Sequence, residues 1–121
     1  MLLGNRRTRD SARAGAGNGG GIIRPMSRDE VLGKLSSLRD DLTRFHVRSL
    51  SLFGSVARGE ATSESDIDLL VEFDVPVGLL EFVRLRRHLE VALGARVDLA
   101  TPAALRDEMR SRILAEAIRA A

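Results

Sequence analysis

Asp66 and Asp68 are the residues of this chain whose type and spacing best suit metal chemistry. On a β-strand, residues two apart project from the same face, with Cα atoms about 6.5–7 Å apart at roughly 3.3 Å of rise per residue. Two such carboxylates can bind one divalent ion, or a pair of ions about 3.5–4 Å apart. The apolar residues between and after them would face a core on the other side: Ile67, Leu69, Val71 and Phe73.

Three more residues extend this pair into a set that suits phosphoryl transfer. Gly54 allows close backbone approach, and Ser55 offers a hydroxyl and an N–H group near an expected helix start, where phosphate can bind. Asp98 lies in a second short apolar stretch that is typical of a strand. An isolated Asp-x-Asp is usually solvated and an isolated Gly-Ser is usually a turn. The prediction of a two-metal site therefore rests on the ordered combination of the Gly-Ser pair, the Asp-x-Asp pair and Asp98.

Arg58 is the cation nearest to the Gly-Ser pair along the chain. Its guanidinium could reach the β- and γ-phosphates of a bound nucleotide. An ion pair with Glu60 or Glu64 on the surface explains the same residue equally well.

The elements that must position these residues alternate between helix and strand. Ser27 and Glu30 have capping-box spacing, so a first helix is predicted from there to about Phe45. Gly94 is a suitable helix stop, and Thr101 with Pro102 is a suitable helix start, whose inner face would hold Leu105, Met109 and Ile113. The remaining elements are predicted as strands over 47–53, 66–73 and 96–100, a short helix over 55–60, and a helix over 79–93. This order predicts an α/β (α+β) fold, a small sheet flanked by helices.

Length and composition indicate one domain, at residues 26–121, behind a tail. Residues 1–25 are rich in Gly and Arg and are predicted to be disordered, although a basic arm that contacts RNA or a partner stays open. The tail has five Arg and one Asp, a net charge of +4, so the rest of the +2 chain totals −2. The domain therefore has no basic surplus that would indicate a direct nucleic-acid substrate.

The residue types that are missing also limit the possibilities. The chain has no Cys, which excludes disulfides and thiolate metal sites and suits the cytoplasm. No apolar run is long enough for a membrane span, and the N-terminal Met-Leu-Leu is too short for a signal peptide. We therefore expect a cytoplasmic protein.

Three stretches resemble a known family: GSVARGEATSESDIDLLVEF, GLLEFVRLRRHLEVALG and RVDLATPAALRDEMRSRILAEAIRA. They are similar to the minimal nucleotidyltransferases (MNT) of the DNA polymerase β-like superfamily. Within it they most resemble the MntA-like antitoxins that pair with HEPN toxins. The resemblance covers roughly residues 26–120, and its key positions correspond to Gly54, Ser55, Asp66, Asp68 and Asp98.

The resemblance implies a polymerase-palm fold and a protein adenylyltransferase. Such an enzyme transfers AMP from ATP to a tyrosine of a HEPN RNase toxin and so silences it. Two Mg²⁺ ions would be held by Asp66, Asp68 and Asp98, and the phosphates by Gly54 and Ser55. Because the chain has no Tyr, it cannot modify itself on tyrosine. Two alternatives stay open: an antitoxin that acts by binding alone, and a small-molecule nucleotidyltransferase of the aminoglycoside-modifying kind.

Overall fold

The computed structural model describes residues 26–121, and the predictions made for residues 1–25 lie outside that range. A four-stranded mixed sheet has the order β3-β2-β1-β4, with β2 and β3 parallel and the other neighbours antiparallel. The strands are β1 (Val47–Phe53), β2 (Ile67–Phe73), β3 (Val97–Ala100) and β4 (Ile118–Arg119). The helices are α1 (Arg28–Ser37), α2 (Arg39–Arg44), α3 (Gly54–Arg58), α4 (Leu79–Leu93), the 3₁₀ turn η4 (Pro102–Ala104) and α5 (Asp107–Glu116). The predicted α/β fold is confirmed.

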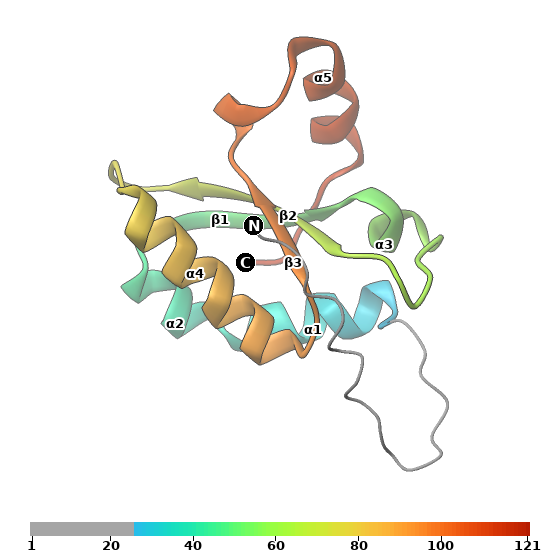
Figure 1. Cartoon of the computed structure of the whole chain (residues 1–121), viewed down its shortest axis with the longest axis horizontal. Coiled ribbons are helices and arrows are strands. Elements are labelled where there is room, and N and C mark those ends of the chain that lie inside the picture. Colours follow the sequence, from blue (N-terminus) through green and yellow to red (C-terminus); the bar gives the residue numbers. More distant parts are fainter. Residues whose placement is uncertain (1–25) are drawn as a thin grey trace.

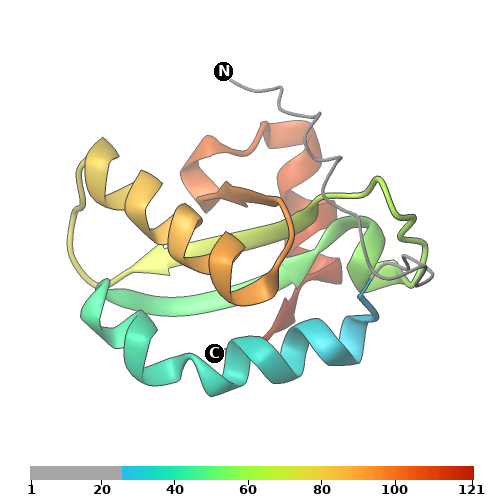
Figure 2. The same ribbon diagram turned by 60° about the horizontal axis from the view of Figure 1, so that its bottom comes forward.

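The two faces of the sheet are covered differently. Helices α1, α2 and α4 lie along one face, whereas α5 stands off the other and α3 sits at one end (Figures 1 and 2). The main core fills the space under α1, α2 and α4, where the inward side chains of the sheet meet the helices. Its fully buried large members are Val31, Leu35, Leu50, Leu52, Leu69, Val71, Leu85 and Leu89. The acids at positions 68 and 98 alternate with core residues, so they lie on the opposite face.

The first predicted helix begins as expected but is divided in two. The capping box is present: the Glu30 amide donates to Ser27 Oγ at 3.1 Å, and the Ser27 amide donates to Glu30 Oε1 at 2.8 Å. Leu38, with φ −95° and ψ 10°, ends α1 and precedes α2. This break lets α2 bend along the sheet, with Leu42 buried in the core.

The middle of the chain matches the prediction closely. Strand β1 and helix α4 have the predicted limits, whereas β2 and β3 each begin one residue later than predicted, at Ile67 and Val97. Gly94 ends α4 in the left-handed conformation with φ 65°. These elements have strong local signals, which are alternating apolar residues, a long apolar stripe and a glycine stop.

The predictions for the C-terminal region were wrong in three respects. Pro102 starts a single 3₁₀ turn, and Leu105 is extended, so α5 begins only at Asp107. Met109 is exposed rather than on an inner face, and Ile113 alone is buried. The segment after α5 forms β4, which pairs with Ser51 and Leu52 of β1. Pairing with an open sheet edge overrides the helical preference of this Ala-rich end.

No helix within residues 26–121 combines the length and the apolar character that a membrane crossing requires.

Candidate active site

Gly54 and Asp68 form the closest contact of the site. Gly54 begins α3 with φ 76°, is buried, and lies against the Asp68 side chain. A Cβ atom at position 54 would be 2.9 Å from Asp68 Cγ and would overlap a carboxylate oxygen. Both the left-handed backbone and the close approach therefore require glycine here. The contact joins the predicted phosphate-binding loop to the predicted metal strand.

Asp98 lies beside Asp68 on the neighbouring strand. The two residues are direct partners in the parallel register of β2 and β3. Asp68 is half-buried and Asp98 is exposed. The pKa of Asp68 is raised to about 6, first by burial and then by the charges of Asp98 and Asp66 and a hydrogen bond to Asp98, while the charge of Arg58 acts in the opposite direction. The clustering of acids expected from the sequence is therefore present around Asp68.

Asp66 is close to this pair, but its carboxylate forms an ion pair with Arg96. It precedes β2, and its Oδ1 atom is 3.0 Å from Nε of Arg96. Arg96 also donates from Nη2 to the backbone oxygen of Glu64 at 3.1 Å. Within residues 26–121, no three His, Asp or Glu side chains are arranged to hold a metal ion together. Carboxylate oxygens on adjacent strands nevertheless suit a hard divalent cation, provided that Asp66 is released from Arg96.

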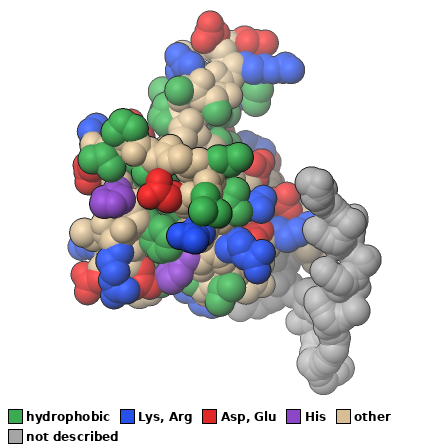
Figure 3. All heavy atoms as spheres, turned by 60° about the vertical axis from the view of Figure 1, so that its left-hand side comes forward, with side chains coloured by type: hydrophobic (Ala, Val, Ile, Leu, Met, Phe, Trp, Pro, Cys, Tyr) green, Lys and Arg blue, Asp and Glu red, His purple; other side chains and the backbone are tan. Residues whose placement is uncertain are grey.

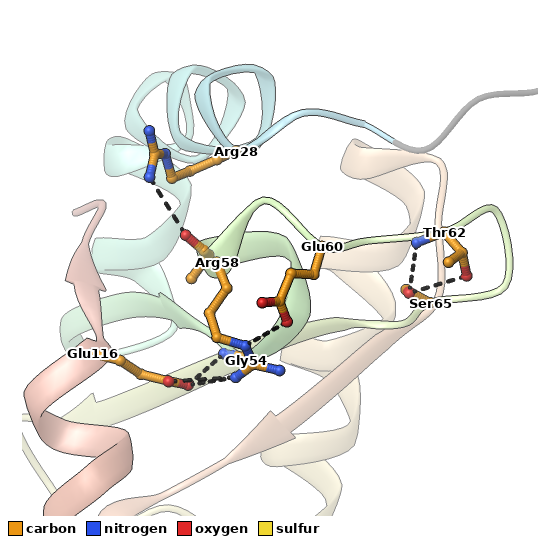
Figure 4. Close-up of polar contacts among 8 residues, drawn as sticks. Arg28, Gly54, Arg58, Glu60, Thr62, Ser65 and Glu116 are labelled. Carbon is orange, nitrogen blue, oxygen red and sulfur yellow. Dashed lines mark hydrogen bonds and ion pairs between the residues drawn. The ribbon is translucent and has the colours of Figure 1, made fainter.

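Arg58 sits between two carboxylates on the other side of Gly54 (Figure 4). Its Nε donates to Glu60 Oε1 at 2.9 Å, and its Nη1 donates to both oxygens of Glu116 at 3.3 Å. These partners raise the pKa of Arg58, the hydrogen bond to Glu60 most strongly. The surface ion pair considered from the sequence is thus present with Glu60. The predicted role of Arg58 in nucleotide binding stays a prediction.

Glu116 was not identified from the sequence as a residue of the site. Its Oε2 atom accepts a hydrogen bond from the Gly54 amide at 2.9 Å, across a separation of 62 residues. The side chain is only 22% exposed and comes from the last residue of α5. Arg96, the partner of Asp66, was also missed. No local pattern marks either residue, because their partners are set by the pairing of β3 and β4 with the sheet.

The loop before β2 is held by its own side chains. The Thr62 amide donates to Ser65 Oγ at 2.9 Å (Figure 4). The Ser65 amide donates to the backbone carbonyl oxygen of Thr62 at 3.0 Å. This closed turn leads directly to Asp66 and fixes where β2 begins.

Two cavities lie away from Asp66, Asp68 and Asp98, none of which lines either of them. One of about 520 Å³ lies between α2, β1 and β4 and includes Arg39, Arg48 and Arg119. The other, of about 730 Å³, lies between the β2–α4 loop and η4 and includes Val75, Leu79 and Phe82. On this side of the molecule, hydrophobic side chains are visible among charged ones (Figure 3).

Comparison with known proteins gives a consistent result. The description "nucleotidyltransferase domain" belongs to a family model that matches residues 35–120. Protein adenylyltransferase MntA of Thermococcus cleftensis is 37% identical over 94 residues, which cover 77% of this chain and 95% of that protein. A solved structure described as a minimal nucleotidyltransferase has a TM-score of 0.68 at 38% identity, covering 77% of this chain and 95% of its own.

A more distant solved structure shares the fold only. It contains a tri-AMPylated HEPN toxin of Shewanella oneidensis in complex with an MNT antitoxin. The matching chain has a TM-score of 0.56 at 20% identity and covers 78% of this chain and 71% of its own. The predicted fold and enzyme class are confirmed by the family match and the closer relatives. The chain belongs to the nucleotidyltransferase domain family.

Proposed function

We propose that this nucleotidyltransferase is an antitoxin that transfers AMP from ATP to a tyrosine of a HEPN-type RNase toxin. The observation that carries the proposal is the arrangement of Asp68, which lies against Gly54 on one side and beside Asp98 on the other. The name of the Thermococcus relative and the AMPylated toxin in the Shewanella complex support the choice of AMP and of a protein acceptor.

The reaction joins the tyrosine oxygen to the α-phosphorus of ATP. As that P–O bond forms, the bond between the α-phosphorus and the α,β-bridging oxygen breaks, and pyrophosphate leaves. The tyrosine hydroxyl loses its proton, which Asp98 would accept and pass to solvent; the exposure of its carboxylate beside Asp68 supports this role. Gly54 and Ser55 would bind the phosphates through the loop that lies against Asp68.

Asp66, Asp68 and Asp98 would hold two Mg²⁺ ions. The ions would activate the attacking oxygen and stabilise the charge on the triphosphate. Burial and the charges of the other two acids raise the pKa of Asp68, and a bound cation would favour its ionised form. Arg96 would exchange its partner Asp66 for solvent when that carboxylate binds an ion.

The acceptor has to be another molecule. The chain contains no Tyr, so a tyrosine acceptor must come from a partner. Asp98 and Asp66 are exposed, which leaves the acids open to a docked surface. We place the reaction in the cytoplasm, where both ATP and an RNase toxin would act.

Incubation with ATP labelled in the α-phosphate tests the proposal against its alternatives. The proposal predicts label on the HEPN protein when this chain, ATP and Mg²⁺ are all present. Label on a small alcohol such as an aminoglycoside would indicate the small-molecule enzyme. Inhibition of the toxin without any label would indicate an antitoxin that acts by binding alone.

A further inference from the structure

Glu116 connects two parts of the site that are far apart in the sequence, the end of α5 and the short helix α3 with Gly54 and Arg58. Its carboxylate accepts from the Gly54 amide at 2.9 Å and from Arg58 Nη1 at 3.3 Å. It ends α5, immediately before the segment that adds β4 to the sheet. Figure 4 shows the side chain reaching from α5 to the start of α3. A single carboxylate therefore joins the C-terminal helix to the Gly-Ser loop.

The bonds of Arg58 leave one edge of its guanidinium for a ligand. Nε is held by Glu60 and Nη1 by Glu116. Within residues 26–121, Nη2 of Arg58 makes no hydrogen bond that competes with a ligand. Because the guanidinium is planar, two fixed nitrogens also fix the direction of the third. The side chain is 46% exposed, so this edge is accessible to an anion.

We infer that Glu116 is a positioning residue that presets Arg58 and the Gly54 loop for the triphosphate of ATP. This inference rests on the proposed use of the site for ATP. A free arginine loses much conformational entropy when it binds phosphate, whereas one that is already held loses less. The Gly54 amide bond acts in the same direction, because it fixes the loop whose N–H groups would face the phosphates.

The negative charge of Glu116 acts against phosphate binding. That charge is already compensated by Arg58 and by the Gly54 amide, and solvent screens what remains. We therefore expect the ordering of Arg58 and of the Gly54 loop to favour ATP binding by more than the repulsion between Glu116 and the phosphates opposes it. The sign of the effect on ATP affinity separates the two possibilities directly.

The test is the affinity for ATP with Mg²⁺ in the absence of any acceptor protein, measured by calorimetry. Glu116→Gln is the sharpest variant, since its amide oxygen can still accept from Gly54 while the ion pair with Arg58 is lost. We expect ATP binding to weaken by about tenfold, which is the typical effect of losing one charge-assisted hydrogen bond. Glu116→Ala, which loses both contacts, should weaken it further. Glu108→Ala, on an exposed acid of the same helix, should leave it unchanged.

A double-mutant cycle shows whether Glu116 acts through Arg58. In an Arg58→Ala background, Glu116→Gln should no longer weaken ATP binding, because the Gly54 contact is retained and the charge that the substitution removes is no longer compensated by Arg58. In steady-state assays Glu116→Gln should raise KM for ATP more than it lowers kcat. If Glu116 only stabilised the fold, its replacement would lower the melting temperature and the active fraction and would leave KM for ATP unchanged.

Two results would overturn the inference. Unchanged ATP affinity in Glu116→Gln would remove the positioning role, and tighter binding would show that Glu116 repels the triphosphate. Either result would leave the proposed function intact, provided that the wild-type protein binds ATP. Failure of the wild-type protein to bind ATP would instead contradict the proposed function.

Discussion

Asp68 and Asp98 are register partners on parallel neighbouring strands, and after burial, the largest cause, the charge of Asp98 and a hydrogen bond to it raise the pKa of Asp68. Two acids held side by side carry an energetic cost as long as no cation separates them. The rigid sheet enforces this proximity, because the strands that carry the acids also carry core residues on the other face. The proximity of these acids therefore lowers the stability of the protein when no metal is bound.

The first prediction concerns pH and stability without metal. The pKa of Asp68 is about 6 in the folded protein and near 3.8 ordinarily, so between these values the folded state binds more protons than the unfolded state. Stability contributed by the protonated group is thus lost as pH rises from about 4 to 6. We expect Asp68→Asn to stabilise the metal-free protein above pH 6 by on the order of 1–2 kcal/mol, allowing for solvent screening.

Chemical denaturation in EDTA at pH 4.5 and pH 7 measures this effect. The stability difference between Asp68→Asn and wild type should be larger at pH 7. Equal differences at both pH values would mean that Asp68 titrates at its ordinary pKa. The comparison is made between the two proteins because the other carboxylates titrate in both.

The second prediction concerns Gly54. Gly54→Ala places a methyl group against the Asp68 carboxylate at a residue with φ 76°. Left-handed strain and overpacking together should destabilise the protein by about 2–4 kcal/mol. Gly33→Ala is the matched control, since Gly33 lies inside α1 with nothing within 4 Å of its added Cβ. It should stabilise the protein by about 0.5–1 kcal/mol through helix propensity. Thermal unfolding of both variants measures the two changes in stability. If Gly54→Ala destabilised the protein only slightly, the close contact between Gly54 and Asp68 would be refuted.

The third prediction concerns Arg96. Its ion pair with Asp66 competes with any metal that needs the same carboxylate. Arg96→Ala should therefore bind Mn²⁺, used as a spectroscopic substitute for Mg²⁺, several-fold more tightly, because an exposed ion pair contributes about 0–1 kcal/mol. Titration followed by electron paramagnetic resonance measures the affinity. Arg86→Ala, on an exposed part of α4, serves as the control. Weaker binding in Arg96→Ala would mean that Arg96 helps to build the site.

The fourth prediction concerns Asp98. Asp98→Asn should lower AMP transfer by more than about 100-fold, beyond the 10–100-fold typical of outer-shell partners of a metal. The fold should persist, because the side chain is exposed. Glu72→Gln is the matched control, since Glu72 follows on the same face of β2 and accepts a hydrogen bond from Ser49 that Gln can also accept. Equal transfer rates in the two variants would exclude Asp98 from the site.

Much of this architecture could be predicted from the sequence because its signals are local. The Asp-x-Asp strand, the Gly-Ser turn and the α4 stripe each depend on neighbouring residues, and all were placed within about one residue. Strand β4 depends instead on the open edge of β1, which no local pattern reveals. The contacts of Glu116 follow from that pairing and the contact of Arg96 with Asp66 follows from the pairing of β3 with β2, so both appeared only in the structure. Leu105 shows the same limit, because it was predicted to lie in a helix that starts at Pro102, whereas α5 begins only at Asp107.

The most direct test of the central claim is the intact mass of a cognate HEPN toxin after incubation with this protein, ATP and Mg²⁺. The proposed function predicts that the toxin gains the mass of one or more AMP groups and loses RNase activity. Asp66→Asn antitoxin should leave the toxin mass unchanged and its RNase activity at least partly intact. An unmodified toxin that wild type and Asp66→Asn inhibit equally well at stoichiometric amounts would contradict the account and indicate neutralisation by binding alone.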